Sequence, residues 1–220
     1  MIPQSTQLAR TSRGFSLVEL MVALALGLVM IGAVVTVFVS NQESARIKQE
    51  LDRAQEAFRF ASHTIMRVVQ QGEIQAPQSS QDLLVVEVSP AVGHRDCVGR
   101  TIGAGFIHTT NTFFIDAAGQ LQCRVVSVSS VAANNTTEVV TIVTGLDAAR
   151  TAFTFGTPSI GSTGYWSDNA LWVLPPGNPP INWANVRSVR VHLAMQSGGE
   201  AIGPTALFSA TMRCGGLDSC

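Results

Sequence analysis

Apolar side chains fill a nearly continuous stretch close to the start of the chain, from Phe15 to Val39, and this stretch contains a single charge, Glu19. At about 25 residues it is long enough to cross a bilayer as a helix and too long for the apolar part of an ordinary signal peptide. Residues 1–14 are polar, contain Arg10 and Arg13 and lack acids, so the positive-inside rule places them in the cytoplasm. The pattern predicts a membrane-spanning segment over 15–39.

Beyond Asn41 the apolar positions become periodic. Seven of them recur at intervals of three or four residues, as on one face of a helix; they are Ile47, Leu51, Ala54, Phe58, Ala61, Ile65 and Val68. Because no stop signal precedes Gly72, one continuous helix is predicted from Phe15 to about Gln71, with an amphipathic half over 40–71. The stripe is expected to pack on a globular domain. A coiled-coil dimer is the alternative, disfavoured because Ala occupies two of the seven positions.

Residues 72–220 are predicted to form a β-rich domain, because short apolar or alternating runs are separated by turn residues. The expected strands are Leu83–Val88, Thr112–Asp116, Leu121–Val126, Glu138–Thr144, Thr151–Phe155, Val189–Met195 and Ala206–Met212. The second and third flank a hairpin signal at Ala117–Gln120, and a Gly- and Pro-rich loop region is expected over 156–185. The predicted fold class is therefore α+β, with a long N-terminal helix packed on a mainly antiparallel sheet.

Charge is sparse. Charged residues make up 13% of the chain, whose formal charge is −1. If residues 1–14 were removed, the loss of Arg10 and Arg13 would leave 12 basic against 15 acidic side chains, a formal charge of −3. A nucleic-acid-binding protein is expected to show clustered Lys and Arg, so direct nucleic-acid binding is not predicted.

Four cysteines are present, and none forms a C-x-x-C pair. With a membrane-crossing N-terminus, this favours disulfides in an oxidising compartment over a zinc site. Four cysteines allow three pairings. Closeness in sequence favours Cys97–Cys123 and Cys214–Cys220, and four buried free thiols are the alternative.

The sequence shows no catalytic constellation, phosphate-binding loop or nucleophile elbow. His94, Asp96 and Cys97 could be drawn as metal ligands, but a metal site needs a fourth ligand and a defined geometry. No enzyme activity, cofactor or metal is therefore predicted. The aromatic residues of the 156–185 region could bind sugar or a partner subunit, although a hydrophobic plug is favoured; they are Tyr165, Trp166, Trp172 and Trp183.

Glu19 is the anomaly in the apolar run, since an acid at the centre of a membrane helix costs about 2.5–3.5 kcal/mol on insertion scales. A signal-anchor helix that tolerates an acid near its interface end is one explanation. Cleavage after Gly14 would supply another, because the new Phe15 amine would lie one helical turn, roughly 6 Å, from Glu19. An amine and a carboxylate of neighbouring helices could then pair.

The segment Gly14-Phe15-Ser16-Leu17-Val18-Glu19-Leu20 resembles the class III leader junction of type IV pilins and type II secretion pseudopilins. The resemblance implies that residues 1–14 are a leader peptide, and that a prepilin peptidase/methyltransferase cuts between Gly14 and Phe15 and methylates Phe15. It also implies that Glu19 guides docking into a growing filament.

A long helix followed by an antiparallel sheet is also the pilin architecture. The chain is most similar to the minor-pilin family called PilW, through Asp96–Arg100, Asn111–Asp116 with Leu121–Cys123, and Val186–Val191. Its tail, Cys214–Cys220, departs from the usual ending of that family.

This resemblance implies a minor pilin that primes or caps type IV pilus assembly near the filament tip, as part of a system for adhesion and twitching motility. The major pilin and other minor pilins would be its partners. The chain would first cross the inner membrane once, with a cytoplasmic N-terminus and a periplasmic β-rich domain, and then enter the filament at the cell surface. A minor pseudopilin of type II secretion and an adhesive or DNA-uptake subunit are the alternatives. The latter would need Arg187 and Arg190 to join distant arginines on one face.

Overall fold

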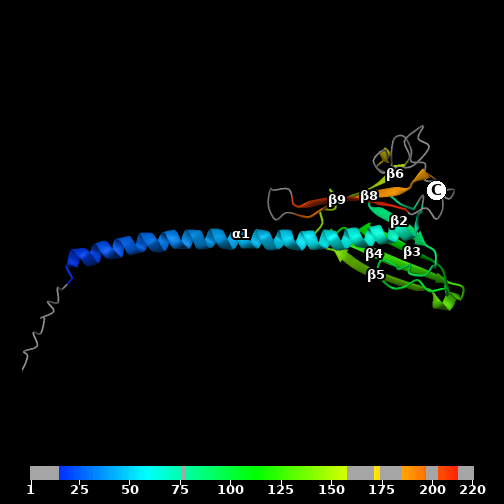
Figure 1. The fold of residues 1–220 in the computed structure, drawn as a ribbon, viewed down its shortest axis with the longest axis horizontal. Helices are drawn as coiled ribbons and strands as arrows, with labels where there is room; N and C mark the ends of the chain where they lie inside the picture. The colour runs from blue at the N-terminus through cyan, green and yellow to red at the C-terminus, as the bar shows by residue number, and fades with distance from the viewer. Residues whose placement is uncertain (1–14, 76–77, 158–170, 174–184, 197–202, 213–220) are drawn as a thin grey trace, which may run out of the picture. The chain divides into compact units, whose positions relative to one another are not determined.

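The computed structural model describes residues 15–75, 78–157, 171–173, 185–196 and 203–212 (Figure 1). It contains a long helix and two antiparallel sheets, which confirms the predicted α+β, pilin-like class. The elements in chain order are α1 (Leu17–Gln71), β1 (Glu73–Ile74), β2 (Leu83–Val88), β3 (Phe106–Ile115), β4 (Leu121–Ser129), the 3-10 turn η1 (Ala132–Asn134), β5 (Thr136–Val143), β6 (Ala152–Thr157), β7 (Leu171–Val173), β8 (Ser188–Ala194) and β9 (Thr205–Thr211).

Helix α1 is continuous over 55 residues, begins two residues later than predicted and ends where predicted, directly before Gly72. Residues up to Glu50 belong to one unit and those from Leu51 to a second, compact unit that holds both sheets. Five positions of the predicted stripe are buried in this second unit, namely Ala54, Phe58, Ala61, Ile65 and Val68. Ile47 and Leu51 are 51% and 41% exposed. The prediction that these two positions pack on the globular domain of their own chain is therefore wrong. The covered part of the stripe begins only at Ala54.

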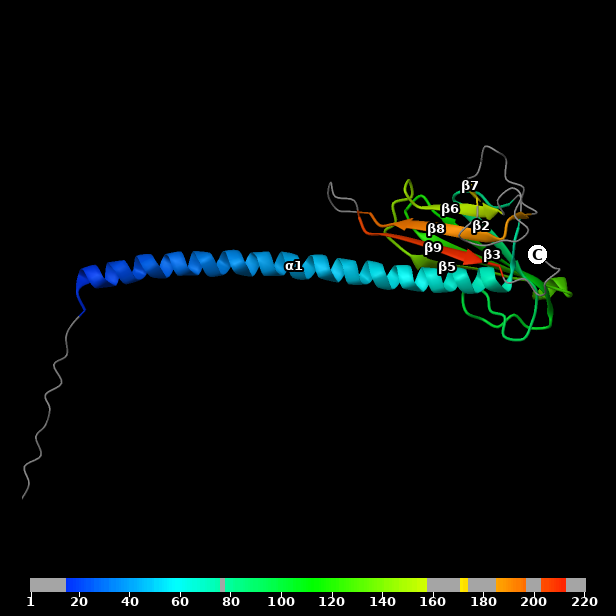
Figure 2. The same cartoon turned by 45° about the horizontal axis from the view of Figure 1, so that its top comes forward.

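The sheets have the orders β1-β2-β3-β4-β5 and β7-β6-β8-β9, and every neighbouring pair is antiparallel. The end of α1 lies alongside strands of both sheets (Figure 2). Alternate side chains of the strands form one core with the stripe of the helix; they include Leu84, Val86 and Val88 of β2, Leu121, Cys123 and Val125 of β4, and Val189, Val191 and Leu193 of β8.

The predicted hairpin is present, with Ile115 opposite Leu121 and Phe113 opposite Cys123. Its first strand starts at Phe106 instead of Thr112, because His108 and Thr110 interrupt the apolar pattern on the outer face although Thr109 and Asn111 are buried on the inner one. Sequence patterning misses β1 and β7, which have two and three residues and are too short for an alternation to show. Strand β7 lies within the region for which the sequence predicts a loop.

Gly72 marks the point where α1 ends against β2. A Cβ atom at this position would lie 2.5 Å from the Glu87 carbonyl oxygen, 2.7 Å from Val86 Cγ1 and 2.8 Å from Val88 Cγ2. Close approach of the helix end to the strand therefore requires glycine, and the last turn of α1 is held firmly on the sheet.

We expect Gly72→Ala to lower the free energy of unfolding by about 1–3 kcal/mol, the usual cost of overpacking a core. Urea unfolding of the full chain in detergent, followed by circular dichroism, measures the change. Gly103→Ala is the matched control, because a Cβ there meets nothing within 4 Å. Equal effects of the two substitutions would contradict the proposed close contact.

Candidate functional site

The start of α1 holds the predicted assembly residue Glu19, and the predicted processing residue Phe15 lies just before the helix. Phe15 is 84% exposed and precedes the helix, and the Leu20 N–H donates to the Ser16 carbonyl oxygen at 3.1 Å. Glu19 is exposed in the first turn. The N–H groups of a first turn lack intrahelical partners and carry partial positive charge, so a carboxylate is stabilised at this position even before any partner arrives. Gly14 lies outside the described residues.

Helix α1 is long and apolar enough to cross a membrane, judged by its length and composition, and its most apolar window is wholly exposed. Among the described residues, none of the ion pairs involves Glu19. The pairing of Glu19 with a cation therefore stays a prediction about a second chain or about the cleaved N-terminus.

The loop between β2 and β3 contains a closed turn, Arg95–Thr101, which we call the clasp. Asp96 is 3% exposed, and its Oδ1 accepts hydrogen bonds from the Val98 N–H at 3.0 Å and the Arg100 N–H at 2.8 Å. The Gly99 N–H donates to the Asp96 carbonyl oxygen at 3.0 Å, and Gly99 has a φ of 94°, which favours glycine. One buried carboxylate thus organises the whole turn.

The same turn occurs between β3 and β4, from Asp116 to Gln120. There Asp116 Oδ1 accepts from the Ala118 and Gln120 N–H groups, and the Gly119 N–H donates to the Asp116 carbonyl oxygen. The two segments share the pattern D-x-x-G, in which an Asp side chain caps its own turn and Gly adopts the left-handed conformation. They differ in burial, since Asp116 lies at a half-exposed hairpin end.

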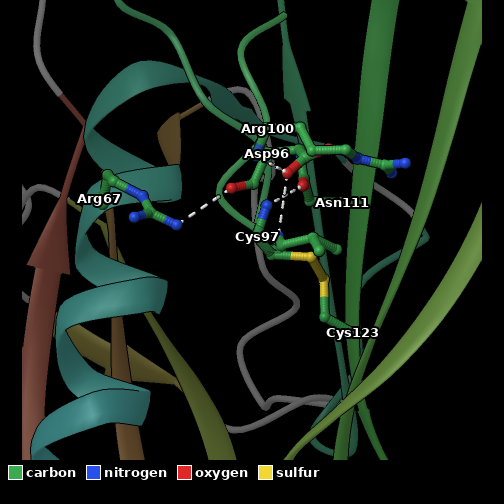
Figure 3. The surroundings of a disulfide bond; sticks show 7 residues. Arg67, Asp96, Cys97, Arg100, Asn111 and Cys123 are labelled. Atoms are coloured by element: carbon green, nitrogen blue, oxygen red, sulfur yellow. Dashed lines mark hydrogen bonds and ion pairs between the residues drawn. A yellow bond between two sulfur atoms is a disulfide. The ribbon is translucent and has the colours of Figure 1, made fainter.

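The clasp is fixed to the end of α1 by two hydrogen bonds. Arg67 Nη2 donates to the Asp96 carbonyl oxygen at 3.1 Å, and the Arg95 N–H donates to Gln71 Oε1 at 2.9 Å. Arg67 and Gln71 are four residues apart and so lie on one face of the helix. Figure 3 shows the Arg67 side chain extending from α1 toward Asp96.

The clasp is also fixed to the five-stranded sheet. Cys97 forms a disulfide with Cys123 of β4, and its N–H donates to Asn111 Oδ1 of β3 at 2.9 Å (Figure 3). Arg100 contacts two carboxylates, with Nε 3.1 Å from Asp96 Oδ2 and Nη1 2.7 Å from Glu138 Oε2 of β5. The clasp therefore joins the helix to β3, β4 and β5.

The disulfide confirms the predicted Cys97–Cys123 pairing, whereas Cys214 and Cys220 lie outside the described residues. The metal alternative at His94, Asp96 and Cys97 finds no support, because Cys97 is oxidised and Asp96 is occupied by its turn. No group of three His, Cys, Asp or Glu side chains in the described part of the chain could hold a metal ion.

Sequence reasoning misses the roles of Arg67, Asn111 and Glu138. Asn111 is fully buried within β3 and Arg67 lies beside the apolar stripe, and nothing in a single sequence distinguishes such residues from ordinary polar positions. The D-x-x-G pattern is the available signal for Asp96.

We expect Asp96→Ala to destabilise the chain by about 2–4 kcal/mol, because the part-buried N–H groups of Val98 and Arg100 lose their acceptor and Arg100 loses a charged partner. Asp116→Ala, which removes the same bonds from a more exposed turn, is the matched control and should cost about 1 kcal/mol, since water can replace the carboxylate there. Urea unfolding in detergent measures both. A cost at Asp96 no larger than that at Asp116 would refute the structural role of the clasp.

The second sheet contains the only described residue of the predicted aromatic cluster. Trp172 of β7 is half-buried, and the Arg190 guanidinium carbon of β8 lies 3.9 Å from its ring centroid. Tyr165, Trp166 and Trp183 lie outside the described residues. The two predicted roles of this aromatic cluster, a hydrophobic plug or a surface that binds sugar or a partner subunit, are therefore not tested.

Residues 9–35 match the family model of the prokaryotic N-terminal methylation motif. The chain carries a class III prepilin methylation motif on a pilin-like fold. The match includes Gly14, Phe15 and Glu19. No curated protein matches the chain.

This motif is the one at which prepilin peptidase processes type IV pilins and pseudopilins, and it implies the same processing, and assembly with pilins, for this chain. Proteins of this class are structural and not enzymatic, in agreement with the sequence prediction. A prepilin with an exposed apolar N-terminal helix is consistent with residence first in the inner membrane and then in a pilus.

Proposed function

We propose that this prepilin is a minor pilin of the PilW family that primes or caps type IV pilus assembly near the filament tip, together with the major pilin and other minor pilins. The observation that carries the proposal is the methylation motif at the start of an exposed apolar helical run, residues 15–39, whose single charge is Glu19. The segments that resemble PilW support it, because Asp96–Arg100 forms most of the clasp and Asn111–Cys123 spans the hairpin that the clasp joins.

Each part of the chain has a role in this proposal. Residues 1–14 are the leader, and cleavage between Gly14 and Phe15 leaves a methylated Phe15. Residues 15–39 cross the inner membrane from a cytoplasmic N-terminus, residues 40–71 continue the helix, and residues 72–220 form the periplasmic domain.

Assembly moves the apolar half of α1 from lipid into a core of neighbouring helices. Both surroundings are apolar, so this exchange alone changes the free energy little. Glu19 provides the free energy that favours assembly. A carboxylate without a partner in an apolar medium is unfavourable, and an opposite charge from a neighbouring subunit stabilises it. The N-terminal amine of a neighbouring mature subunit is the cation that processing creates.

Mass analysis of the N-terminus tests the processing step. The mature chain isolated from membranes should begin at Phe15 and carry one added methyl group, and cells without prepilin peptidase should retain residues 1–14. A chain that keeps residues 1–14 in cells with prepilin peptidase, or that is cut at another position, would refute cleavage between Gly14 and Phe15.

The other candidate, a minor pseudopilin, shares the leader, helix and sheets. Co-purification separates the two, because a minor pilin should be recovered with the major pilin in filaments sheared from cells. Recovery only with subunits of the secretion system would favour the pseudopilin.

A further inference from the structure

Each sheet has one short and one long edge strand. Strands β1 and β7 have two and three residues, whereas β5 and β9 have eight and seven. Within the described residues, β5 pairs only with β4, and β9 pairs only with β8. Each long edge therefore presents backbone N–H and C=O groups that can accept a further strand.

The long edges lack the features that normally prevent pairing between molecules. Natural edge strands are shortened, carry Lys or Pro, or place charges on the strand. Strand β5 reads Thr-Thr-Glu-Val-Val-Thr-Ile-Val and β9 reads Thr-Ala-Leu-Phe-Ser-Ala-Thr, so Glu138 is the only charge on either edge. That charge is paired with Arg100 of the clasp at 2.7 Å, which leaves both edges effectively uncharged.

The two edges also match each other in side chains and in direction. Each carries one exposed large apolar residue, Val139 on β5 at 48% and Leu207 on β9 at 63%. Strands β6 and β9 are both antiparallel to β8 and therefore run the same way. The chain reverses between β5 and β6, so β5 runs against β9 (Figures 1 and 2).

We propose that β5 of one copy pairs antiparallel with β9 of a second copy that lies beside it with α1 in the same direction. The parallel direction of α1 rests on the proposed function, because two copies that share a membrane or a filament have their helices aligned. A symmetric β5–β5 pair would instead turn the two helices in opposite directions. Contact between different surfaces of identical copies closes into a ring or continues as a helical array, depending on the rotation between the copies.

Cross-linking of full-length copies in the membrane tests the pairing. Differently tagged Val139→Cys and Leu207→Cys copies are produced together and treated with a short bismaleimide. A mixed dimer should form in clear excess over either like-with-like dimer. Val92→Cys, at a fully exposed turn, supplies the level due to random collision, and the unsubstituted chain supplies the background from native cysteines.

A second pair of variants shows whether the edge itself is responsible. Thr110, Val126 and Thr137 lie in one row across β3, β4 and β5, so Thr137→Lys and Thr110→Lys place the same charge at the edge and at an inner strand. Thr137→Lys should lower the mixed-dimer yield at least about fivefold, since an edge lysine opposes strand addition, and Thr110→Lys should leave it unchanged.

Three results would overturn the pairing: a mixed-dimer yield at the collision level, a dominant Val139–Val139 product, or equal effects of the two lysines. Recovery of the chain in sheared filaments is scored separately. A missing cross-link in copies that still enter filaments refutes the edge pairing alone. A cross-link in copies that never enter filaments supports the pairing and refutes the pilus function.

Discussion

Glu19→Ala is expected to leave the chain in the inner membrane and to reduce its recovery in sheared filaments at least about tenfold. Removing an acid makes insertion easier, because the cost of placing a carboxylate in lipid disappears. The same change leaves the cation of a neighbouring helix without a partner in an apolar core, which costs about 3–5 kcal/mol when one member of a buried pair is lost. Immunoblots of membrane and sheared fractions measure the two outcomes.

Glu43→Ala is the matched control, because Glu43 is an exposed acid of the same helix beyond the apolar run. It should behave as the unsubstituted chain in both fractions. Glu19→Gln should fail like Glu19→Ala, since the amide keeps the shape of the side chain but not its charge. Normal filament recovery of either Glu19 variant would remove Glu19 from the assembly mechanism.

Joint replacement of Cys97 and Cys123 by Ala is expected to lower the free energy of unfolding by about 3–4 kcal/mol. The two residues are 26 positions apart, and the chain-entropy estimate for a closed loop of that size is about 3.5 kcal/mol, with the mechanism model-dependent. Both side chains are buried, and the clasp that the disulfide holds contacts α1 and three strands. Chemical unfolding of the full chain in detergent measures the loss.

Reductant provides the internal control for this variant. Treatment of the unsubstituted chain with dithiothreitol should reproduce most of the destabilisation, and the double variant should lose little more under the same treatment. Cys214 and Cys220 are present in both chains, so their contribution cancels in the comparison. A double variant as stable as the oxidised parent would show that the clasp is held by its hydrogen bonds and not by the disulfide.

The long helix is predictable because two different patterns meet without a break. Continuous apolarity from Phe15 to Val39 and the stripe from Ala54 to Val68 each indicate a helix, and no Pro separates them. The extent of the covered stripe is not predictable. Ile47 and Leu51 fit the same period as Phe58, and only the placement of the strands decides which positions are covered.

The strands are predictable where one face is apolar. In β8, buried Val189 and Val191 alternate with half-exposed Arg190 and His192, and the prediction is correct to within one residue. The predicted starts of β3 and β5 are wrong by six and two residues. Threonines contribute to the missed ends of both strands, and a run of threonine carries strand propensity but little alternation.

The candidate site also has one part that the sequence predicts, the N-terminal motif, and one part that it does not, the clasp. The N-terminal motif is local in sequence, so the order of residue types alone is enough to select Gly14, Phe15 and Glu19. The clasp depends on contacts between distant segments, such as Arg67 with Asp96 and Arg100 with Glu138. A single sequence contains the turn pattern at Asp96 but not the partners to which the turn is joined.

The shared core of α1 and the two sheets has a consequence for the time course of synthesis. The helix is made first, whereas the core that contains Phe58 and Ile65 also includes Ala210, near the far end of the chain. At translation rates of about 5–20 residues per second, the stripe waits on the order of 8–30 s for its last covering strand. During that interval the apolar stripe of α1 is open to chaperones and to other nascent chains. The order of the elements therefore leaves the stripe of α1 without its complete cover until synthesis is nearly finished.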